Sequence, residues 1–237
     1  MFCFQCQETA KNRGCTVRGV CGKPEGTAAL QDLLVFVCKG ISVYGEELRK
    51  QGTVDREAGR FLCKALFTTV TNVAWDDDAI LGRIREGLKV RDEVREKAAG
   101  FLSGQLPDCA TWTSGDREGI LAKAMSGEVR ITDVRDEDFR SLRELLVIGC
   151  KGIAAYADHA AILGREKDEI HGFLMEALAS TTRNRTVEEM IGMVMKAGDM
   201  AVRTMALLDE ANTAAYGSPE ITEVDIGMVA RELLGAH

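Results

Sequence analysis

Residues 30–44 read LQDLLVFVCKGISVY, and this stretch decides the fold class. Its apolar side chains recur at steps of three and four residues, which places them on one face of an α-helix. The positions concerned are Leu30, Leu33, Leu34, Val37, Ile41, Tyr44 and Leu48. The pattern predicts a long amphipathic helix over about residues 27–50.

The same pattern returns in the second half of the chain. Residues 142–156 read LRELLVIGCKGIAAY, with the tripeptide CKG at 150–152 as at 38–40. The number of residues that separates the two CKG tripeptides also separates two further apolar groups. These groups are Phe61, Leu62, Ala65 and Leu66 in the first half and Phe173, Leu174, Ala177 and Leu178 in the second. Self-similarity at a fixed offset across two helices indicates duplication of a structural unit. We therefore expect an all-α protein made of two three-helix bundles related by internal duplication.

Capping signals place two further helices. Acidic residues at 76–78 favour the positive end of a helix dipole and mark the start of a third helix. Thr186 and Glu189 have the spacing of a capping box ahead of a last long helix, about 187–212. The expected segments are a cysteine-rich cluster-binding segment at 1–26, a first bundle at 27–104, a connector at 105–135, a second bundle at 136–215 and a C-terminal tail at 216–237.

Composition narrows the class of function. The net charge of −7 argues against nucleic acid and anionic membranes as partners, because both attract clustered Lys and Arg. The N-terminus lacks a secretory signal, and no run of about 18 apolar residues is present, so we expect a cytoplasmic protein. In a reducing compartment, clustered cysteines indicate metal or redox chemistry rather than disulfides.

Four of the eight cysteines lie close together at the N-terminus. They are Cys3, Cys6, Cys15 and Cys21, spaced C-x2-C-x8-C-x5-C. Four gathered thiolates need a cation, which an iron–sulfur cluster or zinc supplies. The wide gaps suit paired zinc knuckles badly, so the spacing favours an iron–sulfur cluster and leaves zinc open. Three nearby glycines are expected to let backbone N–H groups approach cluster sulfurs, and these are Gly14, Gly19 and Gly22.

The motifs around these cysteines resemble a known family. Residues 1–10 read MFCFQCQETA, residues 14–16 GCT and residues 19–23 GVCGK. This pattern resembles the hybrid cluster protein family, also called hydroxylamine reductases or prismane proteins. The likeness continues through LQDLL at 30–34, SLRELL at 141–146 and LLDEAN at 207–212 to about Gly227.

The resemblance implies a helical N-terminal domain that binds a [4Fe-4S] cluster through Cys3, Cys6, Cys15 and Cys21. Members of that family are more than twice this length and hold a hybrid cluster in two later domains, through His, Glu and Cys ligands. After Gly227 this chain has no cysteine, and the residues around His237 do not match the family pattern, so we expect no catalytic residue here.

Three functions are therefore compatible with the sequence. The first is electron transfer to a redox partner protein or to catalytic domains outside this chain. The second is hydroxylamine reduction, if hybrid-cluster domains complete the chain. The third is a structural module in which a metal staples the N-terminus and the helices dock a partner.

The remaining cysteines, histidines and methionines have simpler explanations. Cys38, Cys63 and Cys150 lie on apolar helical stretches and are expected in the core, and Cys109 is expected to be inert. His159 and His171 have no second ligand at helical spacing. Five methionines of the last long helix are expected to fill the core, although Met side chains also suit adaptable binding surfaces. They are Met190, Met193, Met195, Met200 and Met205.

Overall fold

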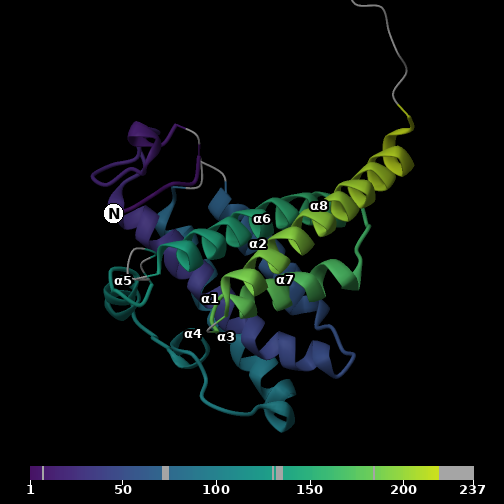
Figure 1. Cartoon of the computed structure of the whole chain (residues 1–237), viewed down its shortest axis with the longest axis horizontal. Coiled ribbons are helices and arrows are strands. Elements are labelled where there is room, and N and C mark those ends of the chain that lie inside the picture. Colours follow the sequence, from purple (N-terminus) through teal and green to yellow (C-terminus); the bar gives the residue numbers. More distant parts are fainter. Residues whose placement is uncertain (7, 71–74, 130, 132–135, 184, 219–237) are drawn as a thin grey trace, which may run out of the picture.

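The computed structural model describes residues 1–6, 8–70, 75–129, 131, 136–183 and 185–218. The regular secondary structure of this described part is helical, apart from one isolated β-bridge near the N-terminus, and the expected all-α class is confirmed (Figure 1). The expected C-terminal tail lies outside the described residues from position 219 onward. The α-helices are α1 (Glu25–Lys50), α2 (Arg56–Val70), α3 (Asp77–Ala98), α4 (Asp108–Thr111), α5 (Arg117–Ala124), α6 (Glu137–Ile162), α7 (Asp168–Ser180) and α8 (Val187–Tyr216).

Helix α1 forms the centre of the core. Eighteen of its 26 residues are buried, so it is enclosed on nearly every side rather than on one apolar face. Helices α3 and α7 provide the largest contacts with it, and α2, α4 and α5 add further ones. Enclosure by helices from both halves of the chain makes one continuous hydrophobic core.

Helix α6 repeats the part of α1 in the second half. Helix α1 begins at Glu25 and ends at Lys50, and α6 begins at Glu137 and ends at Ile162. The two starts and the two ends are separated by the same number of residues as the two CKG tripeptides. Helix α1 packs on α3 and on α7, and α6 correspondingly packs on α8 and on α2. This reciprocal packing is the arrangement expected of a duplicated unit, while the duplication and the division into two bundles stay predictions.

The connector covers one side of α1. The hydroxyl of Tyr44 donates a hydrogen bond to the carbonyl oxygen of Ala110 in α4, at 2.9 Å. The rings of Phe36 and Trp112 meet edge to face, with centroids 6.3 Å apart. At Gly40 the backbones approach so closely that a Cβ atom would overlap the carbonyl oxygen of Cys109. Only glycine allows this contact between α1 and α4.

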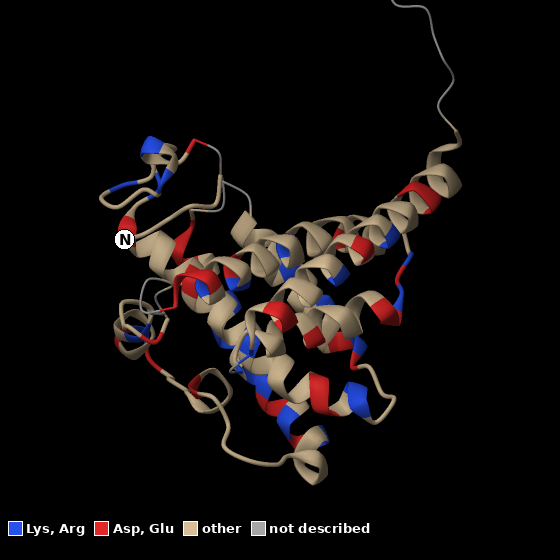
Figure 2. Ribbon diagram, in the orientation of Figure 1, with Lys and Arg blue, Asp and Glu red and all other residues tan. Residues whose placement is uncertain are grey.

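The predicted helix starts are confirmed. The Asp76 side chain caps α3 by accepting the N–H of Ala79, and Thr186 and Glu189 form the capping box of α8. Each cap satisfies backbone donors that a helix end otherwise leaves unpaired. Acidic and basic residues intermingle along the helices that Figure 2 displays.

Helices α1 and α6 are long and apolar enough to cross a membrane by length and composition alone. In α1 the apolar window is 78% buried inside the protein, as in a core helix of a soluble protein. In α6 only 44% of it is buried. The apolar pattern of α1 therefore reflects burial in the protein core.

The methionines of α8 divide between core and surface. Met190, Met193 and Met200 are buried, as expected. The expectation of core filling is wrong for Met195 and Met205, which are 70% and 51% exposed. Both lie on an exposed side of α8, so their helical spacing marks a second apolar face.

Alanine at Gly40 and at its counterpart in the repeat, Gly152, should have opposite effects. Gly40→Ala is expected to destabilise the protein by about 2 kcal/mol or more, because the new methyl group meets a backbone carbonyl that cannot move alone. At Gly152 no atom of the part of the chain that the structure describes lies within 4 Å of the Cβ position. Gly152→Ala should therefore stabilise the isolated chain by about 0.5–1 kcal/mol through helix propensity. Urea unfolding measures both, and equal effects would contradict the contact at Gly40.

Candidate metal centre

The cysteine-rich segment forms a cap beside the N-terminal end of α1, drawn in purple in Figure 1. Its two halves are joined by a β-bridge between Cys3 and Cys15. The Cys3 N–H donates to the Cys15 carbonyl at 3.0 Å, and the Cys15 N–H donates back at 2.8 Å. The bridge brings side by side two cysteines that come from opposite ends of the loop between them.

The four predicted ligands differ in exposure. Cys15 is buried, Cys3 and Cys6 are half-buried, Cys21 is exposed, and all four are free thiols. They share one cap, but no three His, Cys, Asp or Glu side chains of the described residues are grouped closely enough to hold a single metal ion. Their assignment as ligands stays a prediction.

Cys15 has the most developed surroundings of the four. Its sulfur accepts the backbone N–H of Ala10 at 3.5 Å and lies 3.8 Å from the hydroxyl oxygen of Thr9. The hydrogen bond from Ala10, followed by one from the backbone of Val20, lowers the pKa of the Cys15 thiol, although burial opposes them. Backbone donors aimed at a buried sulfur favour the thiolate, which is the form that binds metal.

The glycines of the cap use their own N–H groups to form its turns. The N–H groups of Gly14, Gly19 and Gly22 all donate to carbonyl oxygens of the cap rather than to sulfur. Gly22 has a φ of +94°, a conformation that favours glycine, so it is required by the turn. Ala10 supplies the backbone donor to the sulfur of Cys15. The expectation that these glycines let backbone N–H groups approach cluster sulfurs stays a prediction.

Two buried lysines attach the cap to the helices. Lys151 of α6 donates to the side-chain oxygen of Gln5 at 2.8 Å, between Cys3 and Cys6 in the sequence. Lys23, at the end of the cap, donates to the side-chain oxygen of Gln31 in α1 at 2.7 Å. Sequence reasoning missed both, although the repeated CKG tripeptide was a signal for Lys151.

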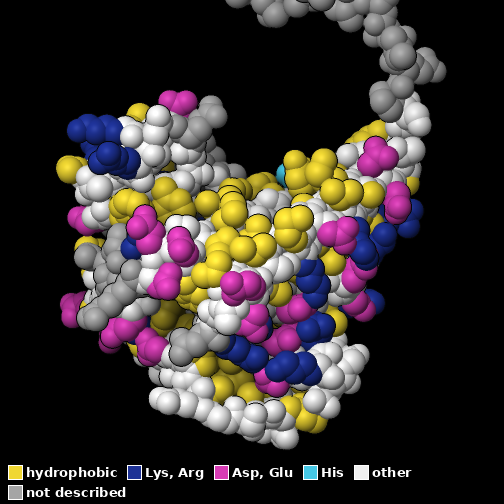
Figure 3. Space-filling view, in the orientation of Figure 1, with side chains coloured by type: hydrophobic (Ala, Val, Ile, Leu, Met, Phe, Trp, Pro, Cys, Tyr) yellow, Lys and Arg dark blue, Asp and Glu magenta, His cyan; other side chains and the backbone are white. Residues whose placement is uncertain are grey.

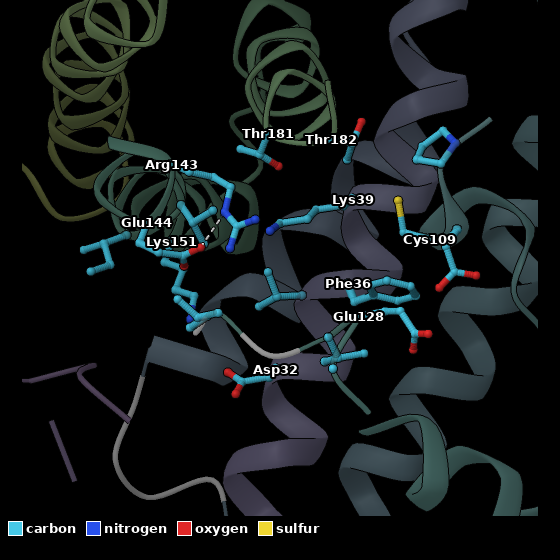
Figure 4. A pocket seen from close by; sticks show the side chains of 18 of the residues that line it. Asp32, Phe36, Lys39, Cys109, Glu128, Arg143, Glu144, Lys151, Thr181 and Thr182 are labelled. Atoms are coloured by element: carbon cyan, nitrogen blue, oxygen red, sulfur yellow. Dashed lines mark hydrogen bonds and ion pairs between the residues drawn. The ribbon is translucent and has the colours of Figure 1, made fainter. Parts of the chain in front are cut away.

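A cavity of about 350 Å³ lies beneath the cap (Figure 4). Gln5 of the cap and Lys151 line it, together with Lys39, the counterpart of Lys151 in the first half. Figure 4 shows Lys39 extending toward Arg143, which pairs with Glu144 at 2.8 Å. This cavity therefore receives the cations of both CKG tripeptides.

Burial shifts the pKa values of two groups in this cavity. Desolvation raises the pKa of Asp32 to about 7, although the charges of Lys151 and other cations lower it. Desolvation also lowers the pKa of Lys151 to about 8, against the opposing effect of Asp32 and Glu144. Both groups therefore titrate near neutral pH beside the cap.

The remaining cysteines are buried, as predicted. Desolvation raises the pKa of Cys38, Cys63 and Cys150 to about 12 and that of Cys109 to about 11, so these thiols stay protonated.

The histidines lie between helices. His171 of α7 is buried against Gly59 of α2. The ring of His159 packs on Phe67, with centroids 5.2 Å apart. Neither is part of a metal-binding group among the described residues.

Residues 1–234 match the prismane/CO dehydrogenase family. The chain belongs to this family. Proteins of the prismane family bind iron–sulfur clusters, and the N-terminal cysteine pattern of this chain is compatible with that chemistry. The resemblance inferred from the cysteine motifs is thereby confirmed.

Relatives of this prismane-family chain carry the name hydroxylamine reductase. The protein from Desulfosudis oleivorans is 70% identical over 96% of the chain, and those from Nitratidesulfovibrio vulgaris and Halothermothrix orenii are 57% and 52% identical over the same share. The chain spans 42% of the length of each of these relatives.

The donor set of the cap fits an iron–sulfur cluster. An iron–sulfur cluster would be held by cysteine thiolates spread around several irons, so its ligands need not converge on one metal ion, and its sulfurs would accept N–H donors. The cap offers four free cysteines, a bridge that joins two of them and a backbone donor on the sulfur of Cys15. Cys3, Cys6, Cys15 and Cys21 would hold the cluster.

The pKa of Asp32 predicts a pH-dependent difference in stability. A folded-state value near 7, above the ordinary 3.8, means that the stabilising contribution of Asp32 is present below pH 4 and is lost as pH rises through 7. The free energy of unfolding of Asp32→Asn, relative to that of wild type, should therefore rise from pH 5 to pH 8. The expected rise is on the order of 1 kcal/mol after discounting for partial exposure. Urea unfolding at both pH values measures it, with the exposed Asp209→Asn as the control for net charge. A pH-independent difference would contradict the shift.

Proposed function

We propose that this chain is a cytoplasmic [4Fe-4S] electron-transfer domain that resembles the N-terminal part of hydroxylamine reductase. The observation that carries the proposal is the bridged, hydrogen-bonded environment of Cys15 within a four-cysteine cap. When bound, a [4Fe-4S] cluster accepts and releases single electrons at a potential set by charge, hydrogen bonds and burial. Its partners would be a redox protein or the catalytic region of a longer enzyme.

The residues of the chain supply binding and tuning. The cysteines bind iron as thiolates, and the N–H of Ala10 stabilises negative charge on the sulfur of Cys15. Lys151 places a positive charge beneath the cap through its hydrogen bond to Gln5. A buried cation near the site favours the more negative, reduced state of any cluster held there.

A second candidate function is hydroxylamine reduction by a complex that includes this chain. The names of the relatives favour it, and since the chain spans 42% of their length, the remaining residues would have to supply the hybrid-cluster ligands. Hydroxylamine turnover by the isolated chain would support catalysis by the chain itself. Electron transfer by a cluster without turnover supports the preferred function.

Metal analysis of anaerobically purified protein tests the cluster. We expect about four iron atoms and four acid-labile sulfides per chain, with an EPR signal induced by dithionite. Cys15→Ser should lose most of the iron, whereas Cys109→Ser, which changes a buried thiol outside the cap, should keep it. Zinc in place of iron and sulfide would instead assign the cap to a structural module without redox function.

The charge of Lys151 predicts a shift in potential. Lys151→Met removes a buried cation that contacts the cap, so the reduced state is less favoured and the midpoint potential should fall by on the order of tens of millivolts. Lys89→Met removes an exposed cation from α3 and should leave it nearly unchanged. Redox titration followed by EPR measures both variants, and equal potentials in the two would contradict the tuning role of Lys151.

A further inference from the structure

An apolar face remains exposed on α6 and α8, and Figure 3 shows apolar side chains gathered over these two helices. The side chains of this α6/α8 face are Leu145, Ile148 and Tyr156 on α6 and Ile191, Met195, Val202 and Met205 on α8. Helices α6 and α8 pack against each other, and the apolar side chains over them form one patch in this view (Figure 3). Contiguous exposed apolar patches on soluble proteins mark interaction sites.

The spacing of these residues is that of a helix-packing seam. On α8, Ile191, Met195, Val202 and Met205 follow the alternating steps of four and three residues, with Gly198 at the middle position. Such spacing keeps side chains in line along one side of a helix and is typical of seams that receive another helix. Among the described residues no atom lies within 4 Å of the Cβ position at Gly198, so no contact with them accounts for the cost of a central glycine.

The corresponding face of α1 shows what such a face requires. In the sequence repeat, the α1 residues that correspond to the α6 face are Leu33, Phe36, Gly40 and Tyr44. All four are buried. The chain that follows α3 covers them, through the contacts of Tyr44 with Ala110, of Gly40 with Cys109 and of Phe36 with Trp112. By the same relation, the cover for α6 belongs to polypeptide that follows α8.

We infer that the α6/α8 face is the docking surface for the polypeptide that follows α8 in the longer hydroxylamine reductase relatives. The chain spans only 42% of the length of these relatives, so they contain ample additional polypeptide. The end of α8 projects beyond the other helices in Figure 1. The inference does not depend on the cluster, because apolar burial rather than metal binding carries it.

Methionine footprinting by pulsed hydroxyl radicals tests the inference. Oxidation is compared between the isolated chain and a fusion in which the part of the Desulfosudis oleivorans relative outside the match is joined after Gly227. Met195 and Met205 should react in the isolated chain and slow by at least about fivefold in the fusion, because docking excludes solvent from the core of an interface. Met125, which is 41% exposed after α5, should react equally in both.

Each other outcome points to a different occupant. Unchanged oxidation of Met195 and Met205 in a folded fusion overturns the inference. Protection of these methionines in the isolated chain at every concentration would assign the face to residues 219–237 of this chain. Protection that grows with concentration would assign the face to a second copy. Both results also overturn the inference. Iron content, measured separately, reports on the proposed electron-transfer function.

Lysine substitutions provide a second measurement. Val202 is 67% exposed on the face, and Ile162 is 74% exposed on α6 outside it. Both Val202→Lys and Ile162→Lys should leave the helicity and melting temperature of the isolated chain unchanged. In the fusion, Val202→Lys should restore the oxidation of Met195, while Ile162→Lys should not. Equal behaviour of the two variants in the fusion contradicts docking at this face.

Discussion

The burial of α1 on all sides is the constraint on which the rest of the structure depends. A helix with this much apolar surface is stable in water only when other helices enclose it, because each exposed apolar side chain would lose the free energy of burial. Helices α3 and α7 enclose two sides, and the connector closes a third at Gly40 and Tyr44. Since α7 belongs to the second half of the chain, enclosing α1 forces the two halves into one core.

The cap depends on this core rather than on apolar residues of its own. The cap has few apolar side chains, and two of them, Val17 and Val20, are largely exposed. The cap therefore cannot form a core by itself. Hydrogen bonds to Lys151 and Gln31 attach it to α6 and α1 instead. Lys151 therefore both anchors the cap at Gln5 and places a positive charge beneath it.

The similarity of the two halves makes their differences informative. Gly40 and Gly152 occupy equivalent positions, yet only Gly40 meets a neighbouring backbone. The lysines of the two CKG tripeptides also differ, since Lys151 contacts the cap and Lys39 extends toward Arg143. One sequence pattern thus supports a covered helix in the first half and a partly exposed helix in the second, because only the first has the connector over it.

The sequence by itself determined the helical class, the helix caps and the burial of Cys38 and Cys150, because periodicity and capping act over a few residues. It also indicated the cysteine cap and the family, through residues close together in the chain. It did not determine that Ala10 rather than a glycine donates to Cys15, that Lys151 contacts Gln5, or that Met195 and Met205 face solvent. Lys151 and Gln5 are distant in the sequence, and the exposure of the two methionines depends on which face of α8 finds a partner. The donor to Cys15 depends on how the loop between Cys3 and Cys15 folds, so only the three-dimensional structure decides all three.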